Sequence, residues 1–387
     1  MANVSSSNGL EKRPKLRFPG FDEPWKVFKA EELFQNITDK NHPDETVLTI
    51  IQGKGTLPRE QAGRNIHYDD ASLSNYKKVE QGDFIIHLRS FEGGLEMANE
   101  AGIVSPAYTI IRCKRPHSSL FYDAYFHTDE FINHNLSKSV EGIRDGRQIS
   151  YEAFKWLGIP YCEPTEQEKI SNLFAALNER IAKQRDLVES LKKYKRGVTE
   201  AIFTKDLRFT TKGVPYPQWD KKYVGDICKI QTGKSNTQDE TSQGSYPFYV
   251  RSPIVRKSNR YLFDCEAVLT VGDGVGTGKV FHYVTGKFDL HQRVYAMTDF
   301  KIVSGKYFYY YFSHFFYDRV MRMTAKTSVD SVRYEMIDKM AIQIPCHEEQ
   351  QQIVSFLDCL EHSVIEAEKT LNLLEKLKSG CLQQLFI

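Results

Sequence analysis

The sequence predicts an α+β fold, in which two α/β domains are separated by two long antiparallel coiled-coil helices in a pseudo-two-fold tandem duplication. Three observations predict it: a long helical segment that occurs twice, shared motifs at the edges of each copy, and short β-type runs between those edges. A chain of 387 residues is also too long for one ordinary core. The expected segments are a flexible lead-in at 1–15, a first domain at 16–160, a first spacer helix at 161–206, a second domain at 207–343 and a second spacer helix at 344–387.

Residues 166–203 and 349–386 are two copies of one segment. At an offset of 183 positions nine residues coincide, namely Glu166/Glu349, Gln167/Gln350, Ile170/Ile353, Leu177/Leu360, Leu191/Leu374, Lys193/Lys376, Lys195/Lys378, Gly197/Gly380 and Phe203/Phe386. Because the offset stays constant over the whole segment, we interpret the two copies as products of a duplication.

Apolar residues in both copies recur in alternating steps of four and three, which is the pattern of a coiled-coil seam. The seam residues are Ile170, Phe174, Leu177, Ile181, Val188 and Leu191 in the first copy and Ile353, Leu357, Leu360, Val364, Leu371 and Leu374 in the second. A helix of 38 residues would be about 57 Å long, and alone it would leave its seam in water. We therefore expect the two copies to pair. Two independent amphipathic helices, each packed on its own domain, are the alternative.

Polar positions in the predicted helices carry further signals. Thr165 and Glu168 form a T-x-x-E capping box just after Pro164, which predicts where the first helix begins. Lys195 and Lys378 occupy the same seam position in the two copies. A lysine there either sets the register of the pair or extends its ammonium group into solvent near the helix end.

Motifs at the domain edges show that the duplication extends beyond the helices. In chain order they are L-R-F (16–18 and 207–209), a tryptophan (Trp25 and Trp219), an acid–aliphatic pair (32–33 and 226–227), Y-E (151–152 and 334–335) and I-P (159–160 and 344–345). The first L-R-F lies where the second helix would lead if the chain were circular. A tandem duplication of this kind predicts a pseudo-two-fold arrangement.

Between these edges the two domains diverge into short β-type runs that are broken by Gly, Asn and Ser clusters. The runs are VLTII, GDFIIHL and AYTIIRC in the first domain and YPFYV, EAVLTV, KVFHYV and RVYAM in the second. Each domain also has a late aromatic segment, FYDAYF or KYFYYYFSHFFYDRVMR, which we interpret as a packing helix. Base stacking by the same rings is the alternative.

Composition narrows the functional class. The net charge is only +2, so any nucleic-acid surface must be local. The chain shows neither a signal peptide nor a run of about 18 apolar residues, so no contact with a membrane is expected. Its seven cysteines include no C-x-x-C pair, which indicates a reduced, cytoplasmic protein.

Motifs for catalysis are missing from the sequence. The glycine-rich stretch 271–280 fits neither a P-loop nor a dinucleotide-binding pattern, and we interpret it as a hairpin turn. Contact of its amides and Lys279 with a phosphate is an open alternative. Metal-ligand spacings, nucleophile motifs and the D/N-P-P-Y/F tetrapeptide of amino-methyltransferases are absent. We therefore predict no catalytic residue, no metal ligand and no cofactor held by this chain.

Basic residues beside amide and hydroxyl side chains are the candidate DNA contacts. They are Lys54, Arg59, Arg64 and Arg89 in the first domain and Lys234, Ser235, Asn236, Arg251, Arg256, Lys257, Asn259, Arg260 and Lys279 in the second. Such loops offer hydrogen bonds to guanine and adenine edges and to phosphates. A charged loop that is merely solvated is the alternative at each position.

The order of these motifs resembles the DNA-specificity subunit of type I restriction–modification systems over about residues 16–387. The Glu-Gln pairs that follow Pro164 and Pro345 carry part of the resemblance. L-K pairs at 191–192 and 377–378, each followed by a terminal I-F or L-F, carry the rest.

The resemblance implies a non-catalytic subunit that directs a larger enzyme of a bacterial or archaeal cytoplasm to its DNA. Each domain would recognise half of a bipartite, non-palindromic site in double-stranded DNA. The helices would dock two methyltransferase subunits, which bind S-adenosylmethionine. Motor-nuclease (restriction) subunits, expected to be two, would use ATP and Mg²⁺. The recognised bases, the spacer length and the presence of a restriction subunit stay open.

Other functions remain as alternatives. One is a methylation-only complex without a motor subunit, and another is a structural adaptor that does not recognise DNA. A nuclease with a scattered acidic site is a third. Cleavage of DNA by the purified chain with Mg²⁺ alone would favour the nuclease, whereas failure to bind any duplex, even with its partner present, would favour the adaptor.

Overall fold

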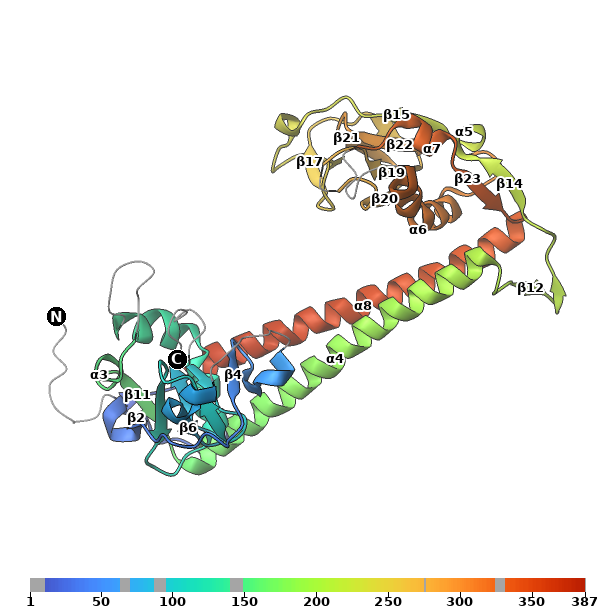
Figure 1. Ribbon diagram of the computed structural model, residues 1–387. Coiled ribbons are helices and arrows are strands. Elements are labelled where there is room, and N and C mark those ends of the chain that lie inside the picture. The colour runs from blue at the N-terminus through green and yellow to red at the C-terminus, as the bar shows by residue number, and fades with distance from the viewer. Residues whose placement is uncertain are drawn as a thin grey trace. The chain divides into compact units, whose positions relative to one another are not determined.

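The computed structural model describes residues 11–62, 70–86, 95–139, 149–274, 276–323 and 331–386. The chain divides into two compact units, unit 1 from residues 1–185 with 369–387 and unit 2 from residues 186–368. Each unit combines one domain with parts of both long helices (Figure 1). The predicted fold class is confirmed. Among the described residues, no helix has the length and apolar character that a membrane span requires.

The two predicted long helices are α4 (Pro164–Thr204) and α8 (His347–Phe386). Helix α4 begins at Pro164, a favourable first position because proline has no N–H to leave without a partner. The N–H groups of Glu166 and Gln167 donate to the carbonyl of Glu163 at 2.9 and 3.0 Å. Thr165 therefore lies inside the first turn, and the predicted capping box is wrong.

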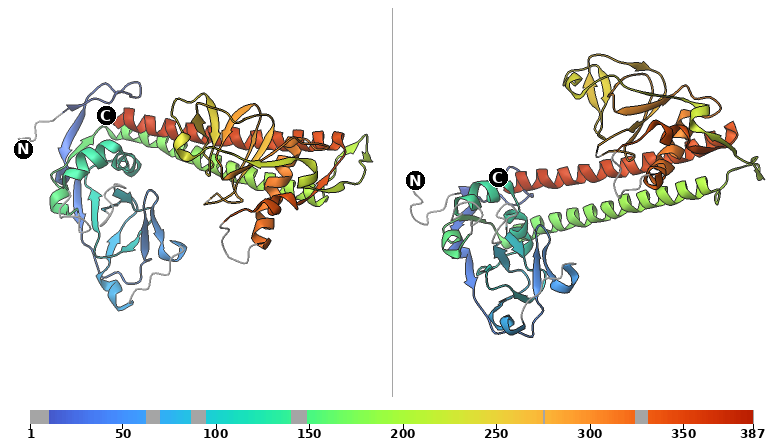
Figure 2. Two further views of the ribbon diagram at one scale, coloured as in Figure 1. Left: turned by 90° about the horizontal axis from the view of Figure 1, so that it is seen from above. Right: turned by 45° about the horizontal axis from the view of Figure 1, so that its top comes forward.

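In unit 1 the C-terminal part of α8 runs antiparallel to the N-terminal part of α4 (Figure 2). The rings of Phe174 and Phe386 are 6.2 Å apart, and Arg185 pairs with Glu375 at 2.6 Å. Residue numbers on α8 fall as those on α4 rise, which defines the antiparallel direction. All twelve predicted seam residues lie on the buried or half-buried face of their helix.

In unit 2 the remaining parts of the helices follow the same direction. Lys192 pairs with Glu368 at 3.0 Å, and Lys195 pairs with Glu361. The second seam lysine, Lys378, lies in unit 1, where burial lowers the pKa of its ammonium group. The equivalent lysines thus have different surroundings, an ion pair for Lys195 and a half-buried position for Lys378.

The edge motifs form an equivalent frame in each unit. In each unit the strand that contains or follows the tryptophan pairs antiparallel with the strand of the I-P motif. One short helix follows the first of these strands, and another short helix precedes the second. The elements are β2 (Trp25–Lys29), α1 (Ala30–Leu33), α3 (Tyr151–Phe154) and β11 (Gly158–Tyr161) in unit 1, and β14 (Asp220–Tyr223), α5 (Val224–Ile227), α7 (Tyr334–Asp338) and β23 (Ala341–Ile344) in unit 2. The duplication therefore holds at the level of elements.

The variable part of unit 1 is built on a four-stranded sheet in the order β3-β10-β7-β8. Its strands are β3 (Phe34–Ile37), β10 (Thr109–Cys113), β7 (Phe84–Ile86) and β8 (Leu95–Met97). Two antiparallel pairs accompany it, the hairpin of β4 (Leu48–Ile51) with β5 (Gly55–Pro58) and the pair of β6 (Lys77–Val79) with β9 (Gly102–Val104). Helix α2 (Ser119–Phe126) packs against β8.

The variable part of unit 2 has two four-stranded sheets, β15-β22-β19-β20 and β17-β16-β21-β18. The strands are β15 (Lys229–Thr232), β22 (Val294–Thr298), β19 (Ala267–Val271), β20 (Phe281–Val284), β17 (Arg256–Ser258), β16 (Tyr246–Tyr249), β21 (Lys287–Leu290) and β18 (Phe263–Asp264). Helix α6 (Gly305–Met323) packs on β19 and β20 (Figure 1). Every predicted β-type run contains a strand. The buried rings of α6, among them Phe312 and Phe316, confirm the predicted packing helix.

A buried carboxylate at the start of each long helix ties the frame together. Glu166 accepts hydrogen bonds from Nε and Nη2 of Arg17 at 2.9 and 2.8 Å and from Nε1 of Trp25 at 3.0 Å. Glu349 accepts the same set, from Nε and Nη2 of Arg208 at 2.7 and 3.0 Å and from the Trp219 indole at 2.8 Å. The L-R-F, Trp and Glu-Gln motifs therefore meet at one point in each unit.

The neighbouring glutamines make a second equivalent contact. Oε1 of Gln167 accepts from the N–H of Ser118 at 3.0 Å, and Oε1 of Gln350 accepts from the N–H of Ser304 at 2.9 Å. The Nε2 group of each donates to the carbonyl five positions earlier, at 2.8 and 3.0 Å. Since the two serines directly precede α2 and α6, each glutamine fixes the start of the aromatic helix.

The N-terminal segment of the chain docks on the end of α8, as residue 207 does on the end of α4. The N–H of Leu16 donates to the carbonyl of Gln384 at 3.0 Å, and that of Leu207 donates to the carbonyl of Ala201 at 2.9 Å. Ala201 and Gln384 are 183 positions apart, so they are equivalent positions. The structure therefore has the circular continuity that the repeated motifs indicate.

We expect Glu349→Gln to lower the free energy of unfolding of unit 2 by about 2–4 kcal/mol, because Arg208 then loses its buried counter-charge. Urea unfolding of the intact chain measures the effect. Its matched control is Glu348→Gln, an exposed carboxylate in the same turn, which should cost less than about 0.5 kcal/mol. Equal stability of the two variants would show that the network does not stabilise the unit.

Candidate nucleic-acid interface

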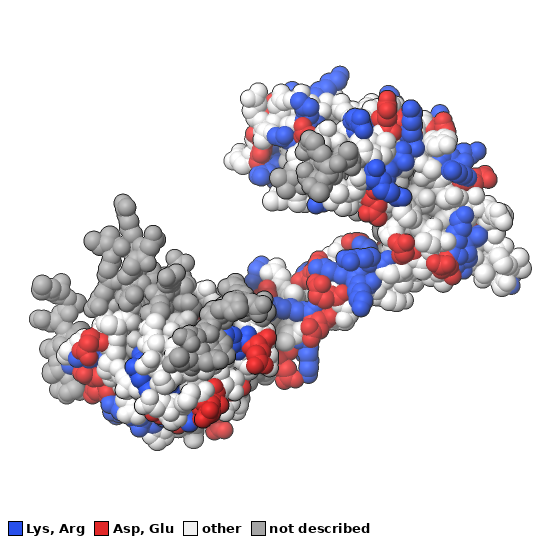
Figure 3. Space-filling view, in the orientation of Figure 1, with Lys and Arg blue, Asp and Glu red and all other residues white. Residues whose placement is uncertain are grey.

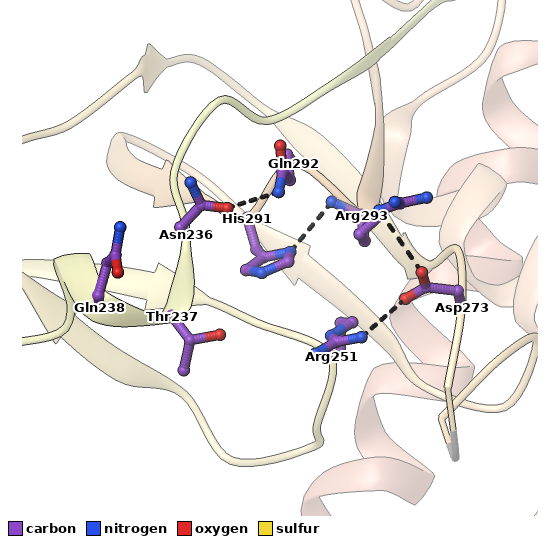
Figure 4. Close-up of a pocket in the computed structure, with 8 residues that line it drawn as sticks. All are labelled: Asn236, Thr237, Gln238, Arg251, Asp273, His291, Gln292 and Arg293. Atoms are coloured by element: carbon purple, nitrogen blue, oxygen red, sulfur yellow. Dashed lines mark hydrogen bonds and ion pairs between the residues drawn. The ribbon is translucent and has the colours of Figure 1, made fainter.

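Unit 2 contains a polar pocket of about 420 Å³, which is formed by loops that extend from its two sheets (Figure 4). It is lined by Asn236, Thr237, Gln238, Arg251, Asp273, His291, Gln292 and Arg293. All eight side chains are polar, so the pocket offers hydrogen bonds rather than an apolar surface. Such a set of amides and guanidinium groups matches the donors and acceptors on base edges.

The loop that follows β15 reaches the pocket by passing close to the end of β21. A Cβ atom at Gly233 would come within 1.9 Å of the carbonyl oxygen of Leu290, so only glycine fits there. Beyond it, the N–H of Ser235 donates to that carbonyl at 3.2 Å, and the N–H of Gln292 donates to the carbonyl of Ser235 at 2.9 Å. The backbone thus sets Asn236 directly beside Gln292.

The buried carboxylate of Asp289 holds this loop by hydrogen bonds. Its side chain is inaccessible to solvent, and it accepts from the hydroxyls of Ser235 at 2.7 Å and Ser258 at 2.9 Å. The guanidinium of Arg260 approaches it to 3.6 Å. Three segments that are distant in sequence are therefore joined under the pocket.

One side of the pocket carries two arginines on a shared carboxylate (Figure 4). Nη1 of Arg251 lies 3.3 Å and Nε of Arg293 lies 3.6 Å from the oxygens of Asp273. Nδ1 of His291 accepts from the N–H of Arg293 at 3.0 Å, so in the neutral ring the proton is on Nε2. Burial, and then the charge of Arg251, lower the pKa of His291, which favours that neutral form.

The other side of the pocket carries an amide pair. Nε2 of Gln292 donates to Oδ1 of Asn236 at 2.5 Å, and the N–H of Asn236 donates to Asp239 at 2.7 Å. Figure 4 shows His291 between this pair and the arginine cluster. Amide and guanidinium groups therefore face the same space from opposite sides.

Charge outside the pocket is mixed. In the view of Figure 3, acidic and basic side chains are interspersed along α4 and α8. This distribution agrees with a net charge of +2. In the part of the chain that the structure describes, no group of three or more His, Cys, Asp or Glu side chains is arranged to hold a metal ion.

The structure brings two of the predicted DNA contacts of unit 2, Asn236 and Arg251, into the pocket. Ser235 is only 2% exposed, and its hydroxyl donates to the buried Asp289 rather than facing the pocket. Arg256 pairs with Glu240 at 3.1 Å. The remaining candidates are exposed, namely Lys234, Lys257, Asn259, Arg260 and Lys279.

Two of these exposed residues also have contacts within the protein. Arg260 pairs with Asp239 at 2.9 Å and so braces the loop that carries Asn236. The ammonium of Lys279 lies 5.0 Å from the ring of Tyr317 on α6. The strands on either side of 271–280, β19 and β20, pair antiparallel, which agrees with the predicted hairpin.

In unit 1 Lys54 is exposed in the tight turn between β4 and β5. The buried carboxylate of Glu96 accepts from the N–H groups of Gly53 at 2.6 Å and Gly55 at 3.0 Å. The side chain of Asn99 donates to the carbonyl of Lys54 at 2.7 Å. The backbone of the turn is thus held at three points, which positions the lysine.

The other predicted contacts of unit 1 differ in accessibility. Arg59 begins a short helix, η1 (Arg59–Ala62), and its Nε and Nη1 atoms are buried. Arg64 and Arg89 lie outside the described residues. Of this set, Lys54 is therefore the described residue that solvent reaches most freely.

Sequence analysis missed most of the pocket. His291, Gln292 and Arg293 form a polar triplet between the apolar ends of β21 and β22, and this interruption is the signal that indicates them. Asp273 lies in the glycine-rich stretch, where the comparison with a P-loop treats the aspartate only as a mismatch to the pattern. Their convergence depends on tertiary structure, which no local pattern shows.

Residues 216–378 match the family model for the Type I restriction modification DNA specificity domain. This part of the chain is similar to the DNA specificity domains of that family. The resemblance found in the sequence is confirmed. The chain is also 28% identical over 142 residues to the Type I restriction enzyme EcoDI specificity subunit of Escherichia coli, covering 37% of this chain and 31% of that protein.

A second curated relative is the MjaVIII specificity subunit of Methanocaldococcus jannaschii, 24% identical over 187 residues, which are 45% of this chain and 43% of the relative. The chain therefore spans less than half the length of either curated relative that it matches. Two solved structures share the fold. The S subunit from M. genitalium has a TM-score of 0.65 at 14% identity, covering 97% of this chain and 99% of that one. The HsdS subunit from Thermoanaerobacter tengcongensis has a TM-score of 0.51 at 16% identity, covering 97% and 98%.

We expect Asp289→Asn to destabilise unit 2 by about 2–3 kcal/mol, since an amide cannot accept from both serines as the carboxylate does. Amide hydrogen exchange should also become faster over residues 233–239, because the loop loses its anchor. The matched control is Asp264→Asn on neighbouring β18, where the carboxylate is exposed. If exchange over 233–239 were the same in the two variants, Asp289 would not be the anchor of the pocket loop.

Proposed function

We propose that the chain is the DNA-specificity subunit of a type I restriction–modification enzyme. In this proposal units 1 and 2 each bind one half of a bipartite, non-palindromic site in double-stranded DNA. The observation that carries the proposal is that equivalent frames hold unlike polar loops. Equivalent frames support related poses on DNA, and unlike loops support two different half-sites.

The frames are alike in their contacts. Glu166 and Glu349 each bind one arginine and one tryptophan from the same motifs. The loops are not alike, because unit 1 presents Lys54 in a glycine turn and unit 2 presents the pocket around Arg251. An adaptor that does not recognise DNA would have no use for a pocket lined by eight polar side chains.

Catalysis in this proposal belongs to partner subunits. Two methyltransferase subunits hold S-adenosylmethionine, and motor-nuclease subunits, expected to be two, use ATP and Mg²⁺. Exposed apolar side chains on the long helices support docking of protein partners there. They are Leu187 and Tyr194 on α4 and Ile365, Leu373 and Leu377 on α8. A methylation-only complex would use the same surfaces without the motor.

Mapping adenine methylation in the host, with and without the gene, tests the proposal. We expect methylation at one split, non-palindromic site that disappears with the gene. Grafting residues 207–343 from a relative should change one half-site and leave the other half and the spacer unchanged. As the matched control, grafting residues 16–160 should change the other half-site alone. A continuous palindrome, or a graft that alters both halves, would contradict the two-domain assignment.

A further inference from the structure

The pocket of unit 2 contains an acid where DNA binding alone would disfavour one. A carboxylate near the phosphate backbone repels it and reduces the number of counterions that binding releases. Asp273 nevertheless lies between the two arginines of the pocket, and its side chain is 23% exposed. Its presence there therefore needs a role other than attraction of the duplex.

The geometry of the contacts suggests that role. Arg251 and Arg293 each approach Asp273 through one nitrogen, at 3.3 and 3.6 Å, and their side chains are 48% and 63% exposed. Each guanidinium has five N–H donors, so one contact leaves donors for a ligand. By contrast, Arg208 uses a two-pronged contact with Glu349 and is 23% exposed. Asp273 thus restrains the two pocket arginines and leaves most of their N–H donors available to a ligand.

The backbone on both sides of the cluster is also fixed. Asp273 forms an antiparallel bridge with Ser331, and the N–H of Arg293 donates to His291. A flexible arginine loses rotamer entropy when a ligand orders it, and this loss weakens binding. A carboxylate held by the fold removes part of that cost before the ligand arrives.

Resting on the proposed function, we propose that Asp273 is a positioning residue that holds Arg251 and Arg293 against guanine in the half-site bound by unit 2. Arginine donates to N7 and O6 of guanine in the major groove, and this contact distinguishes guanine from the other bases. A phosphate is the less suitable ligand, because the Asp273 carboxylate, which lies within 4 Å of both guanidinium groups, would repel it.

The first test uses the assembled methyltransferase complex and duplexes that carry the mapped site. Each guanine of the half-site assigned to unit 2 is replaced in turn by 7-deazaguanine, which lacks the N7 acceptor. We expect at least one replacement to weaken binding by on the order of tenfold. The same replacement should have little further effect on Arg251→Ala or Arg293→Ala, because the contact is already lost. Tolerance of 7-deazaguanine at every position, or a half-site without guanine on either strand, overturns the proposal.

The second test compares Asp273→Ala with Asp264→Ala, which removes the same charge from an exposed position on β18. If Asp273 only contributed charge, both variants would bind the site as tightly as the parent chain or more tightly. A positioning role predicts the opposite sign for Asp273→Ala alone, namely weaker binding to the site together with equal or stronger binding to unrelated duplex. Tighter binding of the site by Asp273→Ala therefore overturns the proposal even if the arginines contact DNA.

The outcomes separate this inference from the proposed function. A methylation map with no gene-dependent split site removes the proposed function, and the inference falls with it. A split site whose unit 2 half tolerates 7-deazaguanine removes the inference alone. The two arginine variants keep the test informative if Asp273→Ala fails to fold, because both arginines are largely exposed.

Discussion

A buried carboxylate at the start of each long helix, Glu166 or Glu349, is the constraint on which the rest of each unit depends. An unpaired charge in that position would cost several kcal/mol, so the carboxylate requires its arginine and its tryptophan. Those partners come from a segment 130 to 149 positions earlier in the chain. The pairing therefore fixes the helix start, the edge strand and the segment before it as one body.

The variable parts of the chain begin where this network ends. Each glutamine beside the buried glutamate fixes the start of an aromatic helix, and the loops beyond are held by local acids instead. Glu96 organises the turn of Lys54 in unit 1, and Asp289 organises the loop of Asn236 in unit 2. These two acids occupy unrelated positions in the repeat, so each unit holds its polar loop by a different solution on the same frame.

Local periodicity explains what the sequence could predict. The steps of four and three give the helices and their seam, alternation gives the strands, and the constant offset gives the duplication. The partners of Glu166 were visible only as repeated motifs, because hydrogen bonding between distant segments has no local signal. The same limit applies to the site. Charge alone makes Arg251, Arg260 and Arg59 equal candidates. In the structure Arg251 lines the pocket, Arg260 pairs with Asp239, and Arg59 is partly buried.

Both units close on themselves in the same way, because Leu16 is attached to the end of α8 as Leu207 is to the end of α4. A circular permutant tests this equivalence most directly. Such a chain begins at Lys205 and joins Ile387 to Leu16 through Lys-Asp, so that five residues separate Gln384 from Leu16 as five separate Ala201 from Leu207. Its control opens the chain inside the seam, between Val188 and Glu189. Urea unfolding should give the permutant a midpoint like that of the parent chain, while the control loses its cooperative transition. A permutant that unfolds like the control would contradict the equivalence of the two units.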